Sequence, residues 1–303
     1  MTLTAVVAIG IAFALEYAIG EPPRRAHPVA WLGRVIAPVD ASWSRPVVVG
    51  ALAAAGIPLA TGILIAGVVG LAATIDPLFG SAVAGIMLFV STSLRMLLTA
   101  AHDVILASET DPRAAREALP TLVGRDPSTL SAAEARSAAV ESAAENLADG
   151  LVAPLLAFAL LAPMSLPLGA GAAAVVKAVN TMDSMIGYPN RPVGRAAARL
   201  DDLVMWIPTR VSAVLLAAAA VDPGSLRRAR RWAHEPASPN SGWPMATLAT
   251  VLGVPLEKPG AYVLNPVGSL PTVADAERGV ALVGRAGLLG YPLAAAPGVI
   301  AWL

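Results

Sequence analysis

The chain has 303 residues, of which 56% are hydrophobic and 14% charged, and its formal net charge is zero. Soluble domains carry roughly 25% charged residues, so this composition predicts an integral membrane protein. The zero net charge gives no overall positive field for nucleic acid. The absence of cysteine excludes disulfides and thiolate metal sites. The three histidines lie far apart in sequence, which argues against a catalytic zinc site.

Seven apolar blocks follow one another along the chain, at residues 1–20, 47–74, 78–100, 151–163, 168–180, 204–221 and 280–303. The first three and the last are long enough to cross a bilayer, and the first is expected to be a retained span. Blocks 151–163 and 168–180 are short and interrupted by prolines, so we expect a re-entrant pair of half-helices. The pattern predicts an all-α polytopic membrane protein, with 1–303 as a single membrane domain of about four to six membrane helices.

Arginines give the expected orientation. They gather in segments 21–46, 101–149 and 181–203, whereas the connectors 75–77 and 164–167 contain no Lys or Arg. Because cytoplasmic loops carry the excess of basic residues, the three basic segments are expected to be cytoplasmic. The polar segment that follows residue 221 is also basic, so we expect that block 204–221 does not fully cross.

Two polar segments interrupt the apolar blocks. Segment 101–149 is predicted to be a cytoplasmic helical insertion, with Asp111 as one N-cap and a capping box at Ser131 and Glu134. Segment 222–279 is expected to be loop-rich. Its stretch HEPASPNSGWPM contains three prolines and a glycine, which is not typical of regular helix.

An acidic face precedes the fourth apolar block. Glu141, Glu145 and Asp149 are spaced four residues apart, so one helix would stack them on one face with Asn146 beside them. The simplest interpretation is a solvated helix face. However, these acids would lie at a helix C-terminus and at the membrane boundary, where negative charge is unfavourable. A bound cation would remove the conflict, and carboxylate ligands suit Mg²⁺.

A second polar face lies in KAVNTMDSMIGYPN. Lys177, Asn180, Asp183 and Ser184 recur at helical spacing after an apolar stretch. A lysine there either snorkels to the membrane surface or faces a cavity or an acid. In the second case it would bind phosphate, with acids and a metal nearby.

Three further stretches contain candidate residues, each with an ordinary structural alternative. Asp201 and Asp202 could simply start a helix, but Arg210 lies inside an apolar block and is harder to explain structurally. Asn240 belongs to SPNSGWPM, which is also common turn chemistry. His27 precedes a proline in a turn, where a histidine is more often structural than catalytic.

Together these stretches resemble the CobD/CbiB family of cobalamin biosynthesis. The resemblance is collinear over nearly the whole chain and rests on the segments HPVAWLGRVI, LVGRDPSTLSAAEARSAAVESAAENLADGLVAPLL, KAVNTMDSMIGYPN, AAARLDDLVMWIPTR and SPNSGWPMATLATVLGVPLEKP. One departure is Gly20-Glu21-Pro22, where the family usually has an aspartate in place of Glu21.

The resemblance implies an adenosylcobinamide-phosphate synthase. Such an enzyme joins adenosylcobyric acid to aminopropanol, or to its O-phosphate, through an amide bond with energy from ATP. It would lie in the inner or plasma membrane among lipid, with a cytoplasmic site, no nucleic acid, and possible association with other cobalamin-pathway proteins. A membrane transporter and a scaffold for pathway enzymes are the alternatives, although the chain shows no internal repeat of the transporter kind.

Residue chemistry then suggests roles in such a ligation. The metal ligands, for Mg²⁺, are expected to be Glu141, Glu145 and Asp149. The catalytic groups are expected to be Glu145, Lys177, Asp183, Asp201 and Asp202. The substrate-binding groups are expected to be His27, Asn146, Asn180, Ser184, Arg210, Asn240 and Trp243. The general base stays open among Glu145, Asp201, Asp202 and His27, and Trp206 with Trp243 are candidate walls for the corrin ring.

Overall fold

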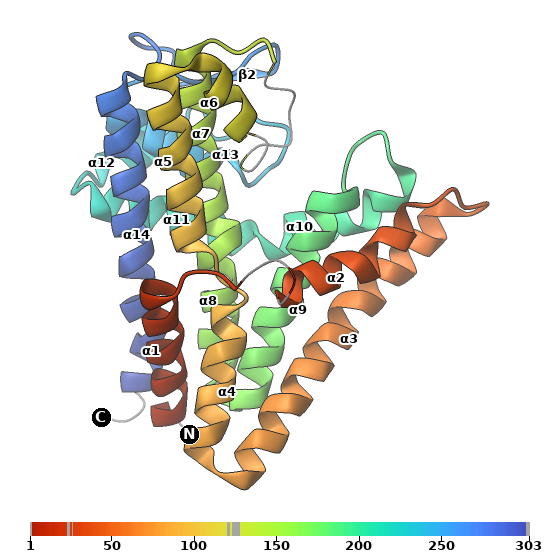
Figure 1. The fold of residues 1–303 in the computed structure, drawn as a ribbon. Coiled ribbons are helices and arrows are strands. Elements are labelled where there is room, and N and C mark those ends of the chain that lie inside the picture. Colours follow the sequence, from red (N-terminus) through yellow and green to blue (C-terminus); the bar gives the residue numbers. More distant parts are fainter. Residues whose placement is uncertain (1, 23–24, 26, 120–121, 123–127, 301–303) are drawn as a thin grey trace. The chain divides into compact units, whose positions relative to one another are not determined.

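In a computed structural model the chain folds almost entirely into helices (Figure 1). The structure describes residues 2–22, 25, 27–119, 122 and 128–300. The chain forms two compact units, each built from separate stretches of sequence. The first unit comprises Met1–Ser93, Asp149–Met205 and Tyr291–Leu303, and the second comprises Leu94–Ala148 and Trp206–Gly290.

The first unit is organised around the long helices α3 and α9. Its elements are α1 (Thr2–Ala18), α2 (Pro28–Ile36), η1 (Ala37–Asp40), α3 (Pro46–Ile75), α4 (Pro77–Phe89), α8 (Ala153–Leu161), α9 (Leu166–Ile186), η4 (Pro192–Gly194) and α10 (Arg195–Val204). Helix α9 packs on α3 and on α8, and α1 packs on α4. At the α3–α9 contact a Cβ added to Gly171 would lie only 2.8 Å from the Gly62 carbonyl oxygen, so small residues permit this close approach.

The second unit is built from α5 (Leu94–Thr110), α6 (Pro112–Ala118), α7 (Ala132–Leu147), α11 (Trp206–Ala219), α12 (Gly224–Ala229), α13 (Gly242–Leu252) and most of α14 (Val273–Ile300). Helix α5 packs on α6 and α7, and α11 packs on α13. Strands β1 (Leu256–Lys258) and β2 (Tyr262–Leu264) form a short antiparallel pair in which Leu256 lies opposite Leu264.

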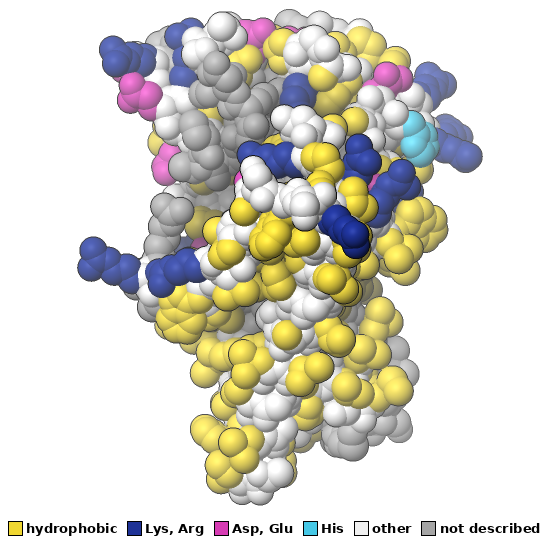
Figure 2. Space-filling model, turned by 90° about the vertical axis from the view of Figure 1, so that its right-hand side faces the viewer, with side chains coloured by type: hydrophobic (Ala, Val, Ile, Leu, Met, Phe, Trp, Pro, Cys, Tyr) yellow, Lys and Arg dark blue, Asp and Glu magenta, His cyan; other side chains and the backbone are white. Residues whose placement is uncertain are grey.

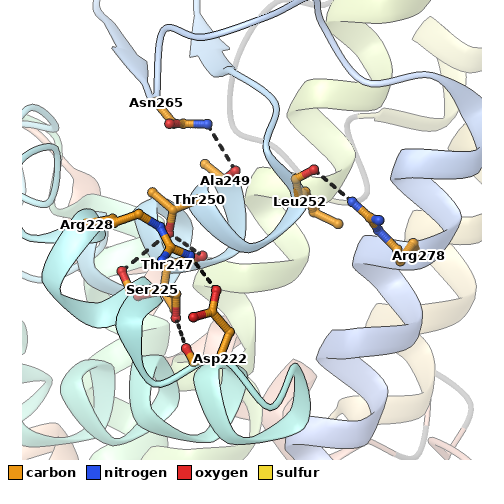
Figure 3. A network of polar contacts seen from close by, with 9 residues as sticks. All are labelled: Asp222, Ser225, Arg228, Thr247, Ala249, Thr250, Leu252, Asn265 and Arg278. Carbon is orange, nitrogen blue, oxygen red and sulfur yellow. Dashed lines mark hydrogen bonds and ion pairs between the residues drawn. The ribbon is translucent and has the colours of Figure 1, made fainter.

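Side-chain donors hold the C-terminal end of α13 (Figure 3). Asn265 donates from Nδ2 to the Ala249 carbonyl oxygen at 3.2 Å. Arg278 donates from Nη2 to the Leu252 carbonyl oxygen at 2.7 Å. The last carbonyls of a helix have no partner within the helix, so these two side chains satisfy groups that would otherwise be unpaired. They fix α13, whose other end carries Trp243.

The described residues include four helices long and apolar enough to cross a membrane, at Pro46–Ile75, Pro77–Thr110, Ala132–Leu161 and Val273–Ala296. A fifth is counted if α10 and α11, bent by 47°, act as one span. Apolar side chains cover the lower part of the face on which α3 lies (Figure 2). Several of them are well exposed, including Leu52, Ile63 and Leu71. The predicted helical, polytopic membrane fold is therefore confirmed.

Two local predictions were wrong. Block 151–163 is not a separate half-helix, because a five-residue π-helix, η3 (Ala148–Val152), joins α7 to α8 in one 30-residue helix. The stretch ending in GWPM also enters a helix, since α13 begins at Gly242. Pro244 is tolerated because it lies in the first turn, where its missing N–H would have no partner in the helix.

Two predicted helix starts were confirmed. Asp111 accepts a hydrogen bond from the Arg113 N–H as the N-cap of α6. The Ser131 hydroxyl accepts from the Glu134 N–H while the Glu134 carboxylate accepts from the Ser131 N–H, which completes the capping box of α7. Whether 204–221 fully crosses a membrane stays a prediction.

Candidate active site

Polar residues of α9 meet acids from other parts of the first unit. Lys177, Asn180 and Asp183 lie three residues apart along α9, so they share one face of the helix. Asn180 donates hydrogen bonds to the carboxylates of Asp149 and Asp201. An amide has two N–H donors, so one asparagine can serve both carboxylates. The sequence predicted the shared face of α9 but not that Asn180 bridges two acids.

The backbone around Asp149 is held by Ser93, a residue of the same unit. The Ser93 N–H donates to the Gly150 carbonyl oxygen at 2.8 Å. A Cβ added to Gly150 would lie 2.6 Å from the Ser93 hydroxyl oxygen, so a side chain at this position would disturb the contact. The wide turn η3 and this hydrogen bond therefore fix the position of Asp149.

Asp183 lies at the C-terminal end of α9, beyond the apolar part of the helix and outside the candidate spans. Burial and the charge of Asp202 raise the pKa of Asp183 from 3.8 to about 6. The carboxylate folds over the helix end, since a Cβ added to Gly187 would lie 1.9 Å from Asp183 Oδ1. Gly187 thus leaves the space that the Asp183 carboxylate occupies.

Asp201 lies on α10 and interacts with three other acids. The charges of Asp149, Asp183 and Asp202 all act on it. Its Oδ1 atom is buried and has no hydrogen-bond partner within the described part of the chain. Like charges in such proximity repel, so a cation or a proton would stabilise the group.

Two acids from the N-terminal region complete the surroundings of Lys177. The charges of Glu21, Asp149 and Glu16 act on the Lys177 ammonium. Glu16 is buried in α1, where it also accepts a hydrogen bond from the Thr92 hydroxyl at 2.8 Å. Sequence analysis missed both glutamates as site residues. The signals were an acid inside the first apolar block and the Gly20-Glu21-Pro22 turn.

His27 caps a helix and lies close to Glu21. Its Nδ1 accepts a hydrogen bond from the Val29 N–H at 3.1 Å, so a neutral His27 carries its proton on Nε2. Nε2 lies 3.4 Å from Glu21 Oε2. This arrangement leaves neutral His27 no lone pair to accept a proton from substrate, which argues against its use as a general base. A role in substrate binding stays a prediction.

We refer to Glu21, Asp149, Lys177, Asn180, Asp183 and Asp201 as the acid–lysine cluster. No group of three or more His, Cys, Asp or Glu among the described residues is arranged to hold a metal ion. Mg²⁺, however, is usually bound by one or two carboxylates together with phosphate oxygens of a substrate. The orphan Asp201 Oδ1 is the kind of oxygen that such a cation would satisfy. The cluster therefore fits Mg²⁺ shared with a phosphate-bearing substrate.

The acids predicted as metal ligands on α7 have other surroundings. Glu141 is 5% exposed and accepts a hydrogen bond from the Tyr262 hydroxyl at 2.8 Å. Asn146 donates to the Ser142 carbonyl oxygen at 2.9 Å, within its own helix. Helix α7 ends at Leu147 and η3 follows, so the four-residue spacing that would align Asp149 with Glu141 and Glu145 no longer applies. Their joint metal site stays a prediction.

A second polar cluster lies in the second unit, between α11 and α13. The Arg210 guanidinium lies 4.3 Å from the ring centroid of Trp206 and 5.2 Å from that of Trp243. Its Nη1 donates to the buried Asn240 Oδ1 at 3.1 Å. We call Trp206, Arg210, Asn240 and Trp243 the arginine–tryptophan cluster. His234 packs edge-on against Trp243 with ring centroids 5.8 Å apart.

Fold and site together define a helical membrane protein with a charged site at the end of a packed helix. A family profile described as CobD/Cbib protein matches residues 9–284. The "Probable cobalamin biosynthesis protein CobD" of Methanothrix thermoacetophila is 35% identical over 301 residues, covering 94% of each chain. The "Cobalamin biosynthesis protein CbiB" of Salmonella paratyphi A is 36% identical over 289 residues, covering 90% of this chain and 88% of that protein. No solved structure matches the chain significantly.

The chain therefore belongs to the CobD/CbiB family of cobalamin biosynthesis proteins. Family membership implies a substrate of the corrinoid type.

Proposed function

We propose that this protein is an ATP-dependent ligase that joins adenosylcobyric acid to aminopropanol, or to its O-phosphate, through an amide bond. Membership of a cobalamin biosynthesis family supports the corrinoid substrate. The observation that carries the proposal is the acid–lysine cluster, in which one lysine and one amide lie among several carboxylates. Such a set suits phosphate groups and the cation that accompanies them.

The proposed reaction has two steps. A corrinoid carboxylate is a poor electrophile, so it first takes the γ-phosphoryl group of ATP and ADP leaves. The nitrogen of the amine then attacks the acyl carbon, the bond from that carbon to the phosphate oxygen breaks, and inorganic phosphate leaves. The attacking nitrogen also loses a proton. Holding the reactants in position would supply much of the rate, as in other phosphoryl transfers.

Each member of the cluster has a role in this scheme. Lys177 would hold a phosphate oxygen through its ammonium group. Asn180 keeps Asp149 and Asp201 apart and oriented. Asp149 and Asp183 are the candidate Mg²⁺ ligands, and the ion would neutralise charge that develops on the phosphate oxygens.

The surroundings of the acids narrow the choice of general base. Asp201 has a buried oxygen without a hydrogen-bond partner among the described residues, so we propose that it accepts the proton of the amine. Asp202 and Glu145 stay predictions for this role. The proposed site faces the cytoplasm of a cell with this protein in its plasma membrane, because ATP is available there.

The test is a direct assay. Purified protein in detergent is incubated with adenosylcobyric acid, aminopropanol phosphate, ATP and Mg²⁺, and the corrinoid product is followed by mass. We expect a new amide with consumption of ATP, and little product from Asp201→Asn that still binds ATP. Product from Asp201→Asn at the wild-type rate would remove Asp201 as the base. The assay is repeated with aminopropanol in place of its phosphate. No product from intact wild type with either amine would overturn the proposed ligase activity and favour a transporter or a scaffold.

A further inference from the structure

The guanidinium of Arg210 is held rigidly by neutral groups. Its Cζ atom lies over the Trp206 and Trp243 rings, at 4.3 and 5.2 Å from their centroids. Among the described residues Nη1 alone makes its hydrogen bonds, to the Trp206 carbonyl oxygen at 2.6 Å, to Asn240 Oδ1 at 3.1 Å and to the Thr209 hydroxyl at 3.4 Å. Two aromatic rings and three acceptors on one nitrogen restrict the rotation of the side chain. The guanidinium is thus presented in a defined orientation.

Arg210 and Trp243 carry N–H donors for which the described part of the chain shows no acceptor. Among the described residues, no Asp or Glu forms an ion pair with Arg210 and no hydrogen bond leaves its Nε or Nη2. In the same unit the indole Nε1 of Trp243 is buried without an acceptor among the described residues, and an unpaired buried donor is costly. The Arg210 side chain is only partly buried, so its free edge is open to a ligand. A bound ligand with negatively charged oxygens would satisfy both.

The geometry of these donors selects the ligand. Nε and Nη2 form one edge of the planar guanidinium, and that edge matches two oxygens of a carboxylate or a phosphate. The start of α13 adds partial positive charge, because this helix begins at Gly242 and no side chain caps it. The guanidinium edge, the Trp243 indole N–H and the start of α13 all favour an anion with at least two oxygens.

We propose that Arg210 and Trp243 form an oxyanion-binding site in the second unit, which takes a carboxylate or a phosphate. The guanidinium edge would bind two oxygens and the indole N–H one of them. The site requires no assumption about the ligase reaction, and its anion has two possible sources. A soluble substrate carries such a group, and so does the headgroup of an anionic lipid.

The first experiment measures binding of simple anions to the whole protein in lipid-free detergent. Inorganic phosphate and acetate are titrated separately, and the midpoint of thermal unfolding is followed, because a ligand that binds only the folded state raises it. Arg210→Gln is expected to weaken the apparent affinity by about tenfold or more, since the positive charge and the paired Nε and Nη2 donors are both lost. Trp243→Phe keeps an aromatic ring but loses the N–H, and about a threefold weakening is expected.

Two further variants make the result specific. Arg210→Lys keeps the positive charge but loses the planar guanidinium edge with its two donors, so it is also expected to bind the anions more weakly than wild type. Arg227→Gln removes an exposed arginine of α12 in the same unit and is expected to bind like wild type. If Arg210→Gln fails to fold, Arg210→Lys and Trp243→Phe decide the question. Wild-type affinity in both, an equal loss in Arg227→Gln, or no response of wild type to either anion would overturn the proposal.

A second arm identifies the source of the anion. The titration is repeated in nanodiscs of phosphatidylcholine alone and of phosphatidylcholine with phosphatidylglycerol. If phosphatidylglycerol suppresses the phosphate response of wild type, an anionic lipid headgroup occupies the Arg210 site. If the phosphate response is equal in both lipids, the site takes a soluble oxyanion. Both outcomes support the site, provided that the response still depends on Arg210.

Discussion

The acid–lysine cluster and the arginine–tryptophan cluster carry unbalanced charge of opposite sign. In the first unit, acids surround one lysine and share an amide, and one of their oxygens has no hydrogen-bond partner among the described residues. In the second unit, one guanidinium lies against two indoles and bonds only to neutral acceptors. One cluster has an excess of negative charge and the other an excess of positive charge.

This difference in charge indicates which kind of ligand each cluster would bind. Unbalanced charge attracts a partner of the opposite sign, most strongly where it is buried, as it is at Asp201, so each cluster indicates the sign of its own ligand. The acids are suited to a cation and, through it, to a phosphate group. Arg210 is suited to an oxyanion directly. Changes in the two clusters should therefore have separable effects, on turnover in one case and on anion binding in the other.

The largest effect is expected from Lys177→Gln. The loss of its positive charge should lower turnover on the order of 100- to 1,000-fold, as for other groups that stabilise developing charge. The response of the protein to inorganic phosphate at Arg210 should stay unchanged. Lys258→Gln, which changes the other lysine of the chain, is the control, since that residue is exposed in β1. Joint loss of turnover and of the Arg210 phosphate response would show that the clusters are not separable.

Gly187→Ala should have the next largest effect. The new Cβ would occupy the position of Asp183 Oδ1, so the carboxylate must move out of the cluster. A misplaced group commonly lowers the rate by about 10- to 100-fold, and we expect that range for turnover. Gly67→Ala, with nothing within 4 Å of the added Cβ, controls for the change of residue type. Turnover equal to that of Gly67→Ala would mean that the position of Asp183 does not matter.

Gly171→Ala tests the packing that supports α9. Its Cβ would lie 2.8 Å from the backbone oxygen of Gly62, an atom that cannot move by a side-chain rotation. Overpacking of this kind typically costs about 1–3 kcal/mol, so unfolding should occur at lower temperature or denaturant concentration. Gly56→Ala, with no atom within 4 Å of its added Cβ, is the matched control in α3. An unchanged midpoint in Gly171→Ala would argue against a tight α3–α9 contact.

Asp183→Asn should have the smallest effect, and at neutral pH it should stabilise the fold rather than destabilise it. Because folding raises the pKa of Asp183 from 3.8 to about 6, the folded state binds more protons between these values, and wild-type stability falls as pH rises through this window. Above it the variant should be more stable than wild type, by less than about 1 kcal/mol because water screens the group. Unfolding is measured from pH 4 to 8 with chelator present. Parallel pH profiles for wild type and variant would contradict the prediction.

Much of the first unit's chemistry could be predicted from sequence, because its local part depends on helical periodicity. Lys177, Asn180 and Asp183 lie on one face as their three-residue spacing requires. The capping box at Ser131 was equally predictable, since it involves residues three apart. Helical periodicity cannot predict which residues from distant parts of the sequence contact this face. Glu16 and Glu21 reach Lys177 only through tertiary packing.

The acidic face of α7 shows where local reasoning fails. Four-residue spacing predicts alignment only while the helix keeps 3.6 residues per turn, and η3 widens the turn just before Asp149. Likewise, Pro244 looked like a helix breaker, yet its place in the first turn of α13 makes it harmless. The contact of Arg210 with Trp206 is local, since the two lie one helical turn apart on α11. Its contacts with Asn240 and Trp243 join residues 30 or more positions apart in sequence, which no local pattern encodes.

The π-helical turn η3 also has a consequence for insertions and deletions. A π-turn holds one more residue than an α-turn, so removing a single residue from Ala148–Val152 would restore an uninterrupted α-helix. The later residues of α8 would keep nearly their present register, because the wide turn absorbs the extra residue, but the residues inside the turn would be reoriented. The count of residues in η3, as much as their identity, therefore sets where Asp149 points.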